Sequence, residues 1–405
     1  MRNKLLKAKL IKDHVKKLDN VMLFFTLLKG FIGLGLLFIP NGFYNGGWAF
    51  SILSLFMSMV VTTTWMLMLI SVSNKYEGLS YSQLGTQALG SFGKFLCDIT
   101  LALSQTSFVI SYTVFIVQNV NEIFASYSGF KFPKIYLYVL WFMMYSPLTW
   151  VRKLQYFARY HLLGDIAVIT TLIIIMIYTG IYMYQEKHFA EDITPFNRDT
   201  YLIFTGTAIF AFEGVGIVLP IKDVAKYPQD YPMVVMSVII VVFFFLWFFG
   251  SFCYFAYGGL LAQAPMITKL LPSGSIPLQI GIVIFMMNVV ISYPLQIHPA
   301  IMITESYIFR KMEHSTLRKW LKNLSRSVIV GITILIGYCL EDSLDRLLSM
   351  IGSVTCTPVA FIMPATLHLM LAAESTSNKV FDVAIIIFGF FVMIYLTSFT
   401  LINWD

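Results

Sequence analysis

Long apolar stretches follow one another along almost the whole chain, separated by short polar segments. An α-helix needs about 20 such residues to cross the hydrocarbon core of a bilayer, which is roughly 30 Å thick. The runs at 277–308 and 327–340 are unusually long and short, so their boundaries are the ones we expect to move. We predict eleven membrane-spanning helices, at 21–42, 47–73, 95–126, 134–151, 162–184, 200–220, 231–258, 277–308, 327–340, 346–372 and 381–402.

The composition supports an all-α integral membrane protein in contact with the lipid bilayer. Of the 405 residues, 58% are hydrophobic and 12% are charged, and the mean hydropathy is +0.76. A typical soluble protein has ~25% charged residues. A soluble fold could not bury this much apolar surface.

Lys and Arg residues are distributed unevenly between the segments that connect the predicted spans. Most of the 28 lie in residues 1–20 and on the same side of the membrane as that segment. Cytoplasmic loops carry the excess of Lys and Arg, so we predict a cytoplasmic basic tail at 1–20 and a C terminus outside the cell or in an organelle lumen. No basic face of a soluble domain indicates nucleic-acid binding. The opposite side carries only Lys131, Lys134, Lys187, Arg198, Lys269 and Arg346.

Two similar glycine motifs occur, one in each half of the chain: GLGLLFIP at 33–40 and GVGIVLP at 214–220. A helix in lipid must satisfy its own backbone hydrogen bonds. Gly-x-Gly interruptions followed by Pro therefore survive only where the freed N–H and C=O groups line a cavity or bind a ligand. A matched pair of interruptions is typical of the central binding site of a transporter.

The motifs also suggest an internal symmetry. Residues 21–184 would form a first repeat of five spans and residues 200–372 a second, joined by an outer loop at 185–199. An odd number of spans in each repeat makes the two inverted. We thus predict a 5+5 inverted repeat with broken helices 1 and 6, followed by span 11 and a short outer C terminus at 373–405.

The first motif predicts a carboxylate site that needs no basic side chain. Gly33 and Gly35 allow close backbone approach, and the N–H groups around Leu34, Gly35 and Leu36 would face a cavity at the positive end of a helix dipole. A small-residue packing face is the alternative. The Gly-x-Gly spacing and its recurrence favour binding.

The second motif places Glu213 inside an apolar run. A carboxylate near the bilayer centre is costly unless it faces water, a partner or a proton. Glu213 could carry a proton or hold a substrate ammonium group; a structural or gating ion pair with Lys29, one helical turn before Gly33, is an equal alternative. The neighbouring candidates for substrate binding are Phe210, Phe212, Gly214 and Gly216.

Polar residues in two further spans complete the candidate site. Tyr112 belongs to a polar stripe that either lines the cavity or bonds to other helices. Ser292 is a candidate ion ligand, and His298 a candidate for proton coupling or gating, although a lone intramembrane histidine is more often a packing residue. The four cysteines show no metal-ligand spacing, and no catalytic constellation occurs. We predict no metal, no cofactor and no enzymatic activity.

The chain resembles the amino acid/auxin permease family, in particular its proton-assisted amino acid transporters and fungal vacuolar amino acid exporters. The resemblance implies an eleven-helix protein with a leucine-transporter-like core that carries amino acids, commonly with protons. It covers nearly the whole chain and rests on LKGFIGLGLLFIP at 28–40, YSQLG at 81–85, FAFEGVGIVLP at 210–220, YPLQ at 293–296 and IGS at 351–353.

One departure from the family concerns the coupling ion. The family often has Thr between the glycines of the first motif, where this chain has Leu34. Sodium-coupled relatives need hydroxyl or amide ligands from spans 1 and 8. Ser292 supplies one, but Phe31 and Leu34 supply none, so the resemblance implies coupling to H⁺ or no coupling rather than Na⁺.

We therefore expect a secondary active transporter of neutral amino acids, coupled to protons and working by alternating access. Its membrane would be that of an acidic organelle, the vacuole or lysosome, or the plasma membrane. The alternative is an amino-acid-sensing receptor or scaffold that binds its ligand without transporting it.

Overall fold

The computed structural model describes residues 17–31, 33–76, 78–152, 155–187, 189–264, 266–272 and 274–404, without the side chains of Lys29, 155–165 and 167. Most of the predicted tail at 1–20 lies outside these residues. The described part is nearly all helical, and its only β pairing is an isolated bridge between Leu18 and Ala225. The prediction of an all-α fold is confirmed.

The first half of the chain forms helices close to the predicted spans, with an interruption in the first and in the sixth. The helices are α2 (Asn20–Phe31), the 3₁₀ helix η1 (Leu34–Phe38), α3 (Ile39–Gly46), α4 (Trp48–Lys75), α5 (Tyr81–Ser128), α6 (Lys134–Trp150), α7 (Gln155–Glu186), α8 (Tyr201–Ala211) and α9 (Val215–Asp223).

The second half is more irregular, because short 3₁₀ and π-helical segments join its longer helices. They are α10 (Tyr231–Tyr257), η2 (Gly258–Gln263), η3 (Ile267–Lys269), α11 (Ile276–Ile308), α12 (Thr316–Leu340), η4 (Glu341–Ser343), α13 (Leu344–Met350), the π-helical η5 (Ile351–Cys356) and η6 (Pro358–Ile362), α14 (Met363–Leu371) and α15 (Thr376–Ile402).

Eight helical stretches of the described part are long and apolar enough to cross a membrane. The predicted first span is not among them because it is broken into short pieces, and α6 has only 17 residues. The predicted ninth and tenth spans form one continuous stretch from Thr316 to Leu371. A multi-pass membrane fold is confirmed, whereas the number eleven stays a prediction.

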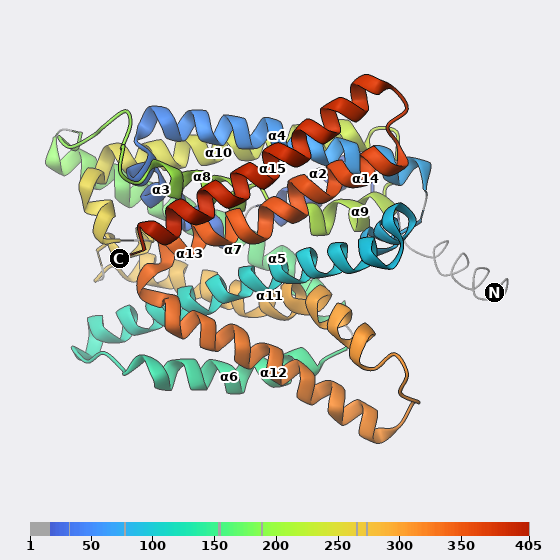
Figure 1. The fold of residues 1–405 in the computed structure, drawn as a ribbon. Helices are drawn as coiled ribbons and strands as arrows, with labels where there is room; N and C mark the ends of the chain where they lie inside the picture. Colours follow the sequence, from blue (N-terminus) through green and yellow to red (C-terminus); the bar gives the residue numbers. More distant parts are fainter. Residues whose placement is uncertain are drawn as a thin grey trace.

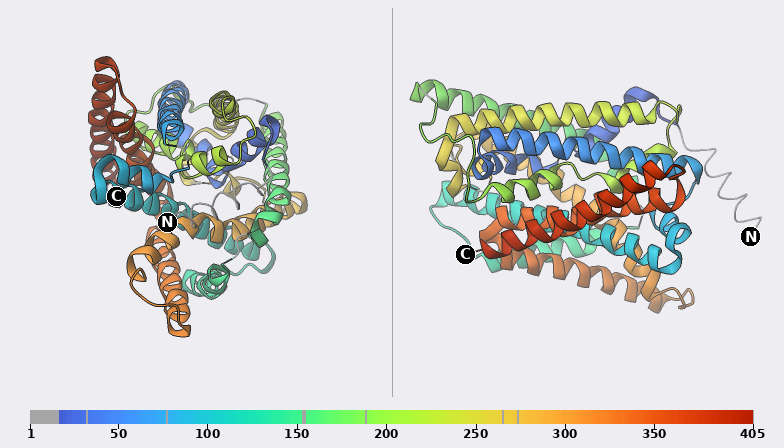
Figure 2. Two further views of the ribbon diagram at one scale, coloured as in Figure 1. Left: turned by 90° about the vertical axis from the view of Figure 1, so that its right-hand side faces the viewer. Right: turned by 45° about the horizontal axis from the view of Figure 1, so that its top comes forward.

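The helices run side by side, with α2 beginning at one end of the bundle and α15 ending at the other (Figure 1). We call the end where α2, α10, α12 and α15 begin the N-side end. Its assignment to the cytoplasm stays a prediction. α6 and α12 pack on each other at the edge of the bundle, across from α4 and α10 (Figure 2).

Two predicted loops at the N-side end are partly helical. α5 begins at Tyr81, inside the predicted loop 74–94, and bends at Leu89 and Gly90, where Gly90 has a φ of 63°. Such a φ strains residues with a side chain, so glycine suits the bend. α12 begins at Thr316 rather than at 327, because its first turns carry an apolar face among their Lys and Arg residues.

α8 is held tightly against the π-helical segment η5. A Cβ atom on Gly206 would lie 2.5 Å from the backbone oxygen of Ser349, and one on Gly352 would overlap the backbone oxygen of Gly206. Only glycine permits this approach. The outer half of the sixth span is therefore locked, backbone to backbone, to the tenth.

Candidate functional site

The first helix break separates α2 from α3. α2 ends at Phe31, Gly33 is extended (φ −143°, ψ −159°), and the chain resumes as η1 without a side-chain hydrogen bond at its start. Pro40 lies in the first turn of α3, where its missing N–H costs little. The N–H group of Leu36 donates to the carbonyl oxygen of Gly33 at 3.2 Å, so it is already engaged within the chain.

The second break separates α8 from α9 at Phe212, Glu213 and Gly214. The side-chain carboxyl group of Glu213 lies beside the backbone N–H groups of Val215 and Gly216, the first residues of α9. Glu213 is 6% exposed, and its Oε1 atom makes no hydrogen bond within the described part of the chain. The positive end of α9 thus already faces a carboxyl group of the protein itself.

The two breaks lie side by side. The inner half-helices α2 and α9 pack on each other, and a Cβ atom on Gly214 would lie 2.5 Å from the ring of Phe31. A Cβ atom on Gly30 would overlap the side chain of Ile217. Glycine at these positions lets the interrupted segments meet closely.

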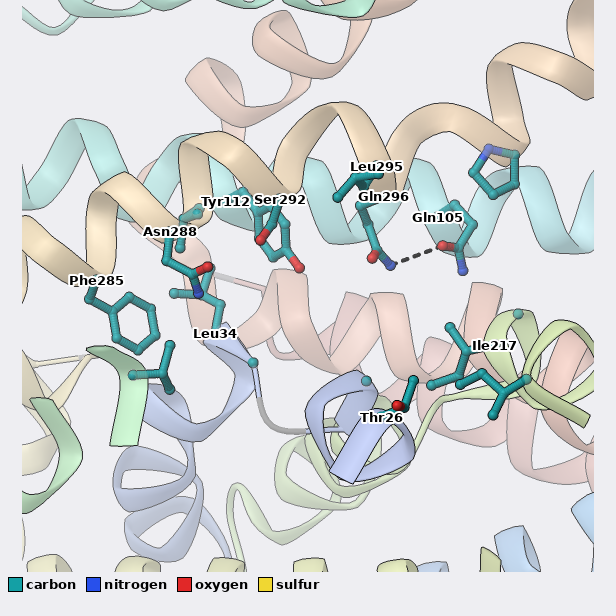
Figure 3. A pocket seen from close by; sticks show the side chains of 17 residues that line it. Thr26, Leu34, Gln105, Tyr112, Ile217, Phe285, Asn288, Ser292, Leu295 and Gln296 are labelled. Carbon is teal, nitrogen blue, oxygen red and sulfur yellow. Dashed lines mark hydrogen bonds between the residues drawn. The ribbon is translucent and has the colours of Figure 1, made fainter. Parts of the chain in front are cut away.

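A cavity of about 320 Å³ lies beside both breaks (Figure 3). Its walls come from α2, η1, α5, α7, α9 and α11, and it includes Gly33 and Leu34 of the first break and Gly216 of the second. A smaller cavity of about 90 Å³ shares these three residues and reaches Glu213. Together the cavities join the two breaks in one site.

The larger cavity extends from the breaks toward the N-side end. Thr26 of α2 and Ile221 of α9 line it in that direction. Beside the breaks, the rings of Phe108 and Phe210 stack at a centroid distance of 4.7 Å and line the smaller cavity. The aromatic pair thus bounds the site next to the N-terminal half of the sixth span.

Polar groups on α5 and α11 face the larger cavity. The side-chain amide of Gln296 donates to the amide oxygen of Gln105 at 2.9 Å, which links the two helices (Figure 3). Asn288 also lines the cavity, and its buried Oδ1 has no hydrogen-bond partner in the described residues. Among the described side chains that line the larger cavity, none is a carboxylate or an ammonium group.

The structure brings most of the residues singled out in the sequence to these two cavities. The second motif contributes to the smaller cavity chiefly, and Ser292 of α11 to the larger one. The residues that line one or both are Gly33, Leu34, Gly35, Tyr112, Phe210, Glu213, Gly214, Gly216 and Ser292.

Three candidates do not line either cavity. Leu36 is 3% exposed, and the 3₁₀ geometry of η1, with three residues per turn, turns it away from Leu34. Phe212 is fully buried. His298 follows Gln296 by two residues on α11, which rotates its side chain by about 200° around the helix. The side chain of Lys29, and with it the predicted pair with Glu213, lies outside the described residues.

Gln105, Gln296 and Asn288 were not among the candidates, although all three are polar residues within apolar spans. Their polarity was a usable signal. Which of the many polar residues in a span face the cavity depends on how α5 and α11 rotate against each other, and a single span does not encode that.

Comparison with known proteins follows the same lines. The family model described as "Transmembrane amino acid transporter protein" matches residues 16–402. Vacuolar amino acid transporter 3 of Saccharomyces cerevisiae is 30% identical, with 97% of this chain and 58% of that protein covered. Vacuolar amino acid transporter 4 of the same yeast is 28% identical, with 95% and 59% covered. This chain spans just under three fifths of these two relatives.

A plant relative and a solved structure match over more of their own length. Amino acid transporter AVT3A of Arabidopsis thaliana is 24% identical, with 91% of this chain and 85% of that protein covered. The crystal structure of MhsT in complex with L-phenylalanine matches with a TM-score of 0.56 and 14% identity, over 93% of this chain and 98% of that one. The match confirms the leucine-transporter-like fold.

Proposed function

This chain belongs to the family of transmembrane amino acid transporter proteins, and from that premise we propose that it carries neutral amino acids together with protons by alternating access. Its family and its relatives are transporters rather than enzymes. The observation that carries the proposal is a cavity that touches both helix breaks and has an uncharged described lining.

The lining supports the choice of neutral substrates. A cavity of about 320 Å³ falls at the lower end of the roughly 300–1,000 Å³ of small-molecule sites. Its described wall offers amide and hydroxyl groups among apolar side chains. A substrate side chain with a full charge would lose its hydration there without a partner of opposite charge.

The two breaks would bind the common part of every amino acid. The substrate carboxylate would approach the start of η1, where no side chain of the protein occupies the N–H groups. The ammonium group would donate to unpaired acceptors nearby, of which Oε1 of Glu213 and Oδ1 of Asn288 are buried without a partner in the described residues.

Glu213 is the proposed proton carrier. It is the carboxylate that lines the cavities in the described residues. Protonation would remove a buried charge beside the substrate, so the two events are energetically linked. The vacuolar amino acid transporters among the relatives support the membrane of an acidic organelle as the site of this activity.

The test is transport by the purified chain in proteoliposomes with an imposed pH gradient. Labelled leucine, phenylalanine, serine and glutamine represent neutral substrates, and labelled lysine and glutamate are the charged controls. We expect concentrative uptake of neutral amino acids that a protonophore abolishes and that is equal in Na⁺ and K⁺ buffers. Binding without flux under every gradient would instead identify a sensor, and preferential uptake of lysine or glutamate would overturn the substrate class.

A further inference from the structure

A second cavity lies far from the helix breaks, where the connection between α11 and α12 meets the end of α6. It measures about 350 Å³ and lies at the N-side end of the bundle (Figure 1). We call it the basic pocket. Its side chains are Arg152, His314, Ser315, Thr316, Arg318, Lys319 and Lys322.

The basic pocket carries a surplus of positive charge. The nearest buried carboxylate, Glu305, is shared between Lys322 at 2.5 Å and Arg326 at 2.7 Å. Arg318 donates to the backbone carbonyl of Phe309 at 3.0 Å. Among the described side chains no carboxylate pairs with Arg152, Arg318 or Lys319, and none lines the pocket.

The helix beside the basic pocket exposes an apolar stripe from its first turn onward. The stripe occurs at helical spacing, and each of its side chains is more than half exposed. Exposed apolar residues of a membrane protein at such positions contact lipid chains, and Trp prefers the interface with the headgroups. The stripe consists of Leu317, Trp320, Leu324, Val328, Ile332 and Leu335.

The basic pocket therefore lies where lipid headgroups meet lipid chains. Arg318 and Lys319 interleave with Leu317 and Trp320 on the same two turns of α12. A ligand whose phosphate enters the pocket would place attached acyl chains along the apolar stripe. A soluble phosphate would gain nothing from that stripe.

We propose that the basic pocket binds the phosphate-bearing headgroup of an anionic phospholipid from the leaflet at the N-side end. Guanidinium groups bind phosphate oxygens in pairs, and lysines add point charges. The site uses residues outside the cavities at the helix breaks. It stands independently of the proposed transport activity.

Native mass spectrometry of the full chain in detergent tests the proposal. The probes are dioctanoyl phosphatidylinositol 4-phosphate, dioctanoyl phosphatidylcholine and inorganic phosphate. We expect the first to bind in a one-to-one ratio and clearly more tightly than the other two. A cation near a membrane surface contributes about fivefold in affinity, so the double variant R318Q/K319Q should lose about 25-fold.

Two further variants separate the charge of the basic pocket from the charge of the molecule. The matched control K75Q/K379Q removes two exposed cations at the same end, outside the pocket, and should bind as the unmodified chain does. K319Q alone keeps the contact of Arg318 with Phe309 and should lose about fivefold. W320Q should weaken binding of the lipid but leave any binding of inorganic phosphate unchanged.

Three results would overturn the proposal. Equal affinity for the phosphatidylinositol phosphate and phosphatidylcholine would remove the headgroup specificity. Equal losses in R318Q/K319Q and K75Q/K379Q would reduce the effect to overall charge. Inorganic phosphate that binds as tightly as the lipid would assign the basic pocket to a soluble anion.

Discussion

The two helix breaks share a sequence motif but differ in what occupies the helix that follows. After the first break the chain resumes as the 3₁₀ helix η1, whose start has no side-chain acceptor. After the second it resumes as α9, whose first N–H groups lie beside the carboxyl group of Glu213. One break is open to an external anion, and the other already faces an internal one.

This difference teaches that Gly-x-Gly determines where a helix is interrupted and not what the interruption binds. The residue immediately before the glycines decides the second point. Ile32 precedes the first motif and Glu213 the second. The comparison assigns the substrate carboxylate to the first break and the proton to the second, and four experiments address that division.

Val in place of Gly35 or Gly216 should have the largest effect, because both glycines lie against cavity walls. A Cβ atom on Gly35 would lie 3.2 Å from the Phe210 ring, and one on Gly216 would lie 3.2 Å from Nε2 of Gln105. We expect uptake in proteoliposomes to fall to background for either variant while the protein is still folded by size-exclusion chromatography. Normal uptake by one of them would show that its break is not required.

Replacement of Glu213 by Gln should abolish concentrative uptake and leave exchange of substrate across the membrane. The amide keeps an acceptor for the N–H groups of α9 but cannot carry a proton. Uptake would then stay constant as the imposed pH gradient is varied. The matched control is E341Q, a carboxylate with 5% exposure that lies beside Lys134 rather than at a break; its uptake should follow the gradient as before.

The same Gly→Ala change should destabilise the second break and spare the first. A Cβ atom on Gly214 would lie 2.5 Å from the Phe31 ring, whereas nothing in the described structure lies within 4 Å of one on Gly33. Overpacking costs about 1–3 kcal/mol, so G214A should unfold at a lower temperature and G33A at an unchanged one. Equal unfolding temperatures for the two variants would mean that the ring of Phe31 moves aside freely.

The amide pair of Gln105 and Gln296 should give the smallest effect. Hydrogen bonds between membrane helices contribute about 0.6 kcal/mol on average, and we expect a coupling energy of that size from a double-mutant cycle of Q105A and Q296A on substrate affinity. Gln118 lies on the same helix as Gln105 but bonds to the backbone of Glu341. Q118A and Q296A should therefore be additive.

The sequence predicted the features that depend on local chemistry. Glycine and proline interrupt helices by their own backbone properties, so both breaks and the position of Pro40 could be expected from short motifs. The apolar runs likewise located the spans, since the length of a membrane helix is set by the bilayer. Glu213 could be singled out because a carboxylate in an apolar run needs a reason.

Features that depend on how helices meet were not predictable in this way. Leu36 left the site because η1 is a 3₁₀ rather than an α-helix, which changes the angle between successive side chains. Gln105 and Gln296 entered it because α5 and α11 face each other there. The division of the ninth and tenth spans also failed to appear, because the helix continues from Thr316 to Leu371 through short irregular turns.

The backbone contact between Gly206 and Gly352 has a mechanical consequence. α8 cannot slide past η5 without forcing two main chains through each other, whereas α9 begins anew after a non-helical hinge and packs chiefly on α2 and α4. In any rocking motion α8 is therefore the fixed post and α9 the swinging arm. Spectroscopic labels on α9 and η5 should change their separation during a transport cycle, and labels on α8 and η5 should keep theirs.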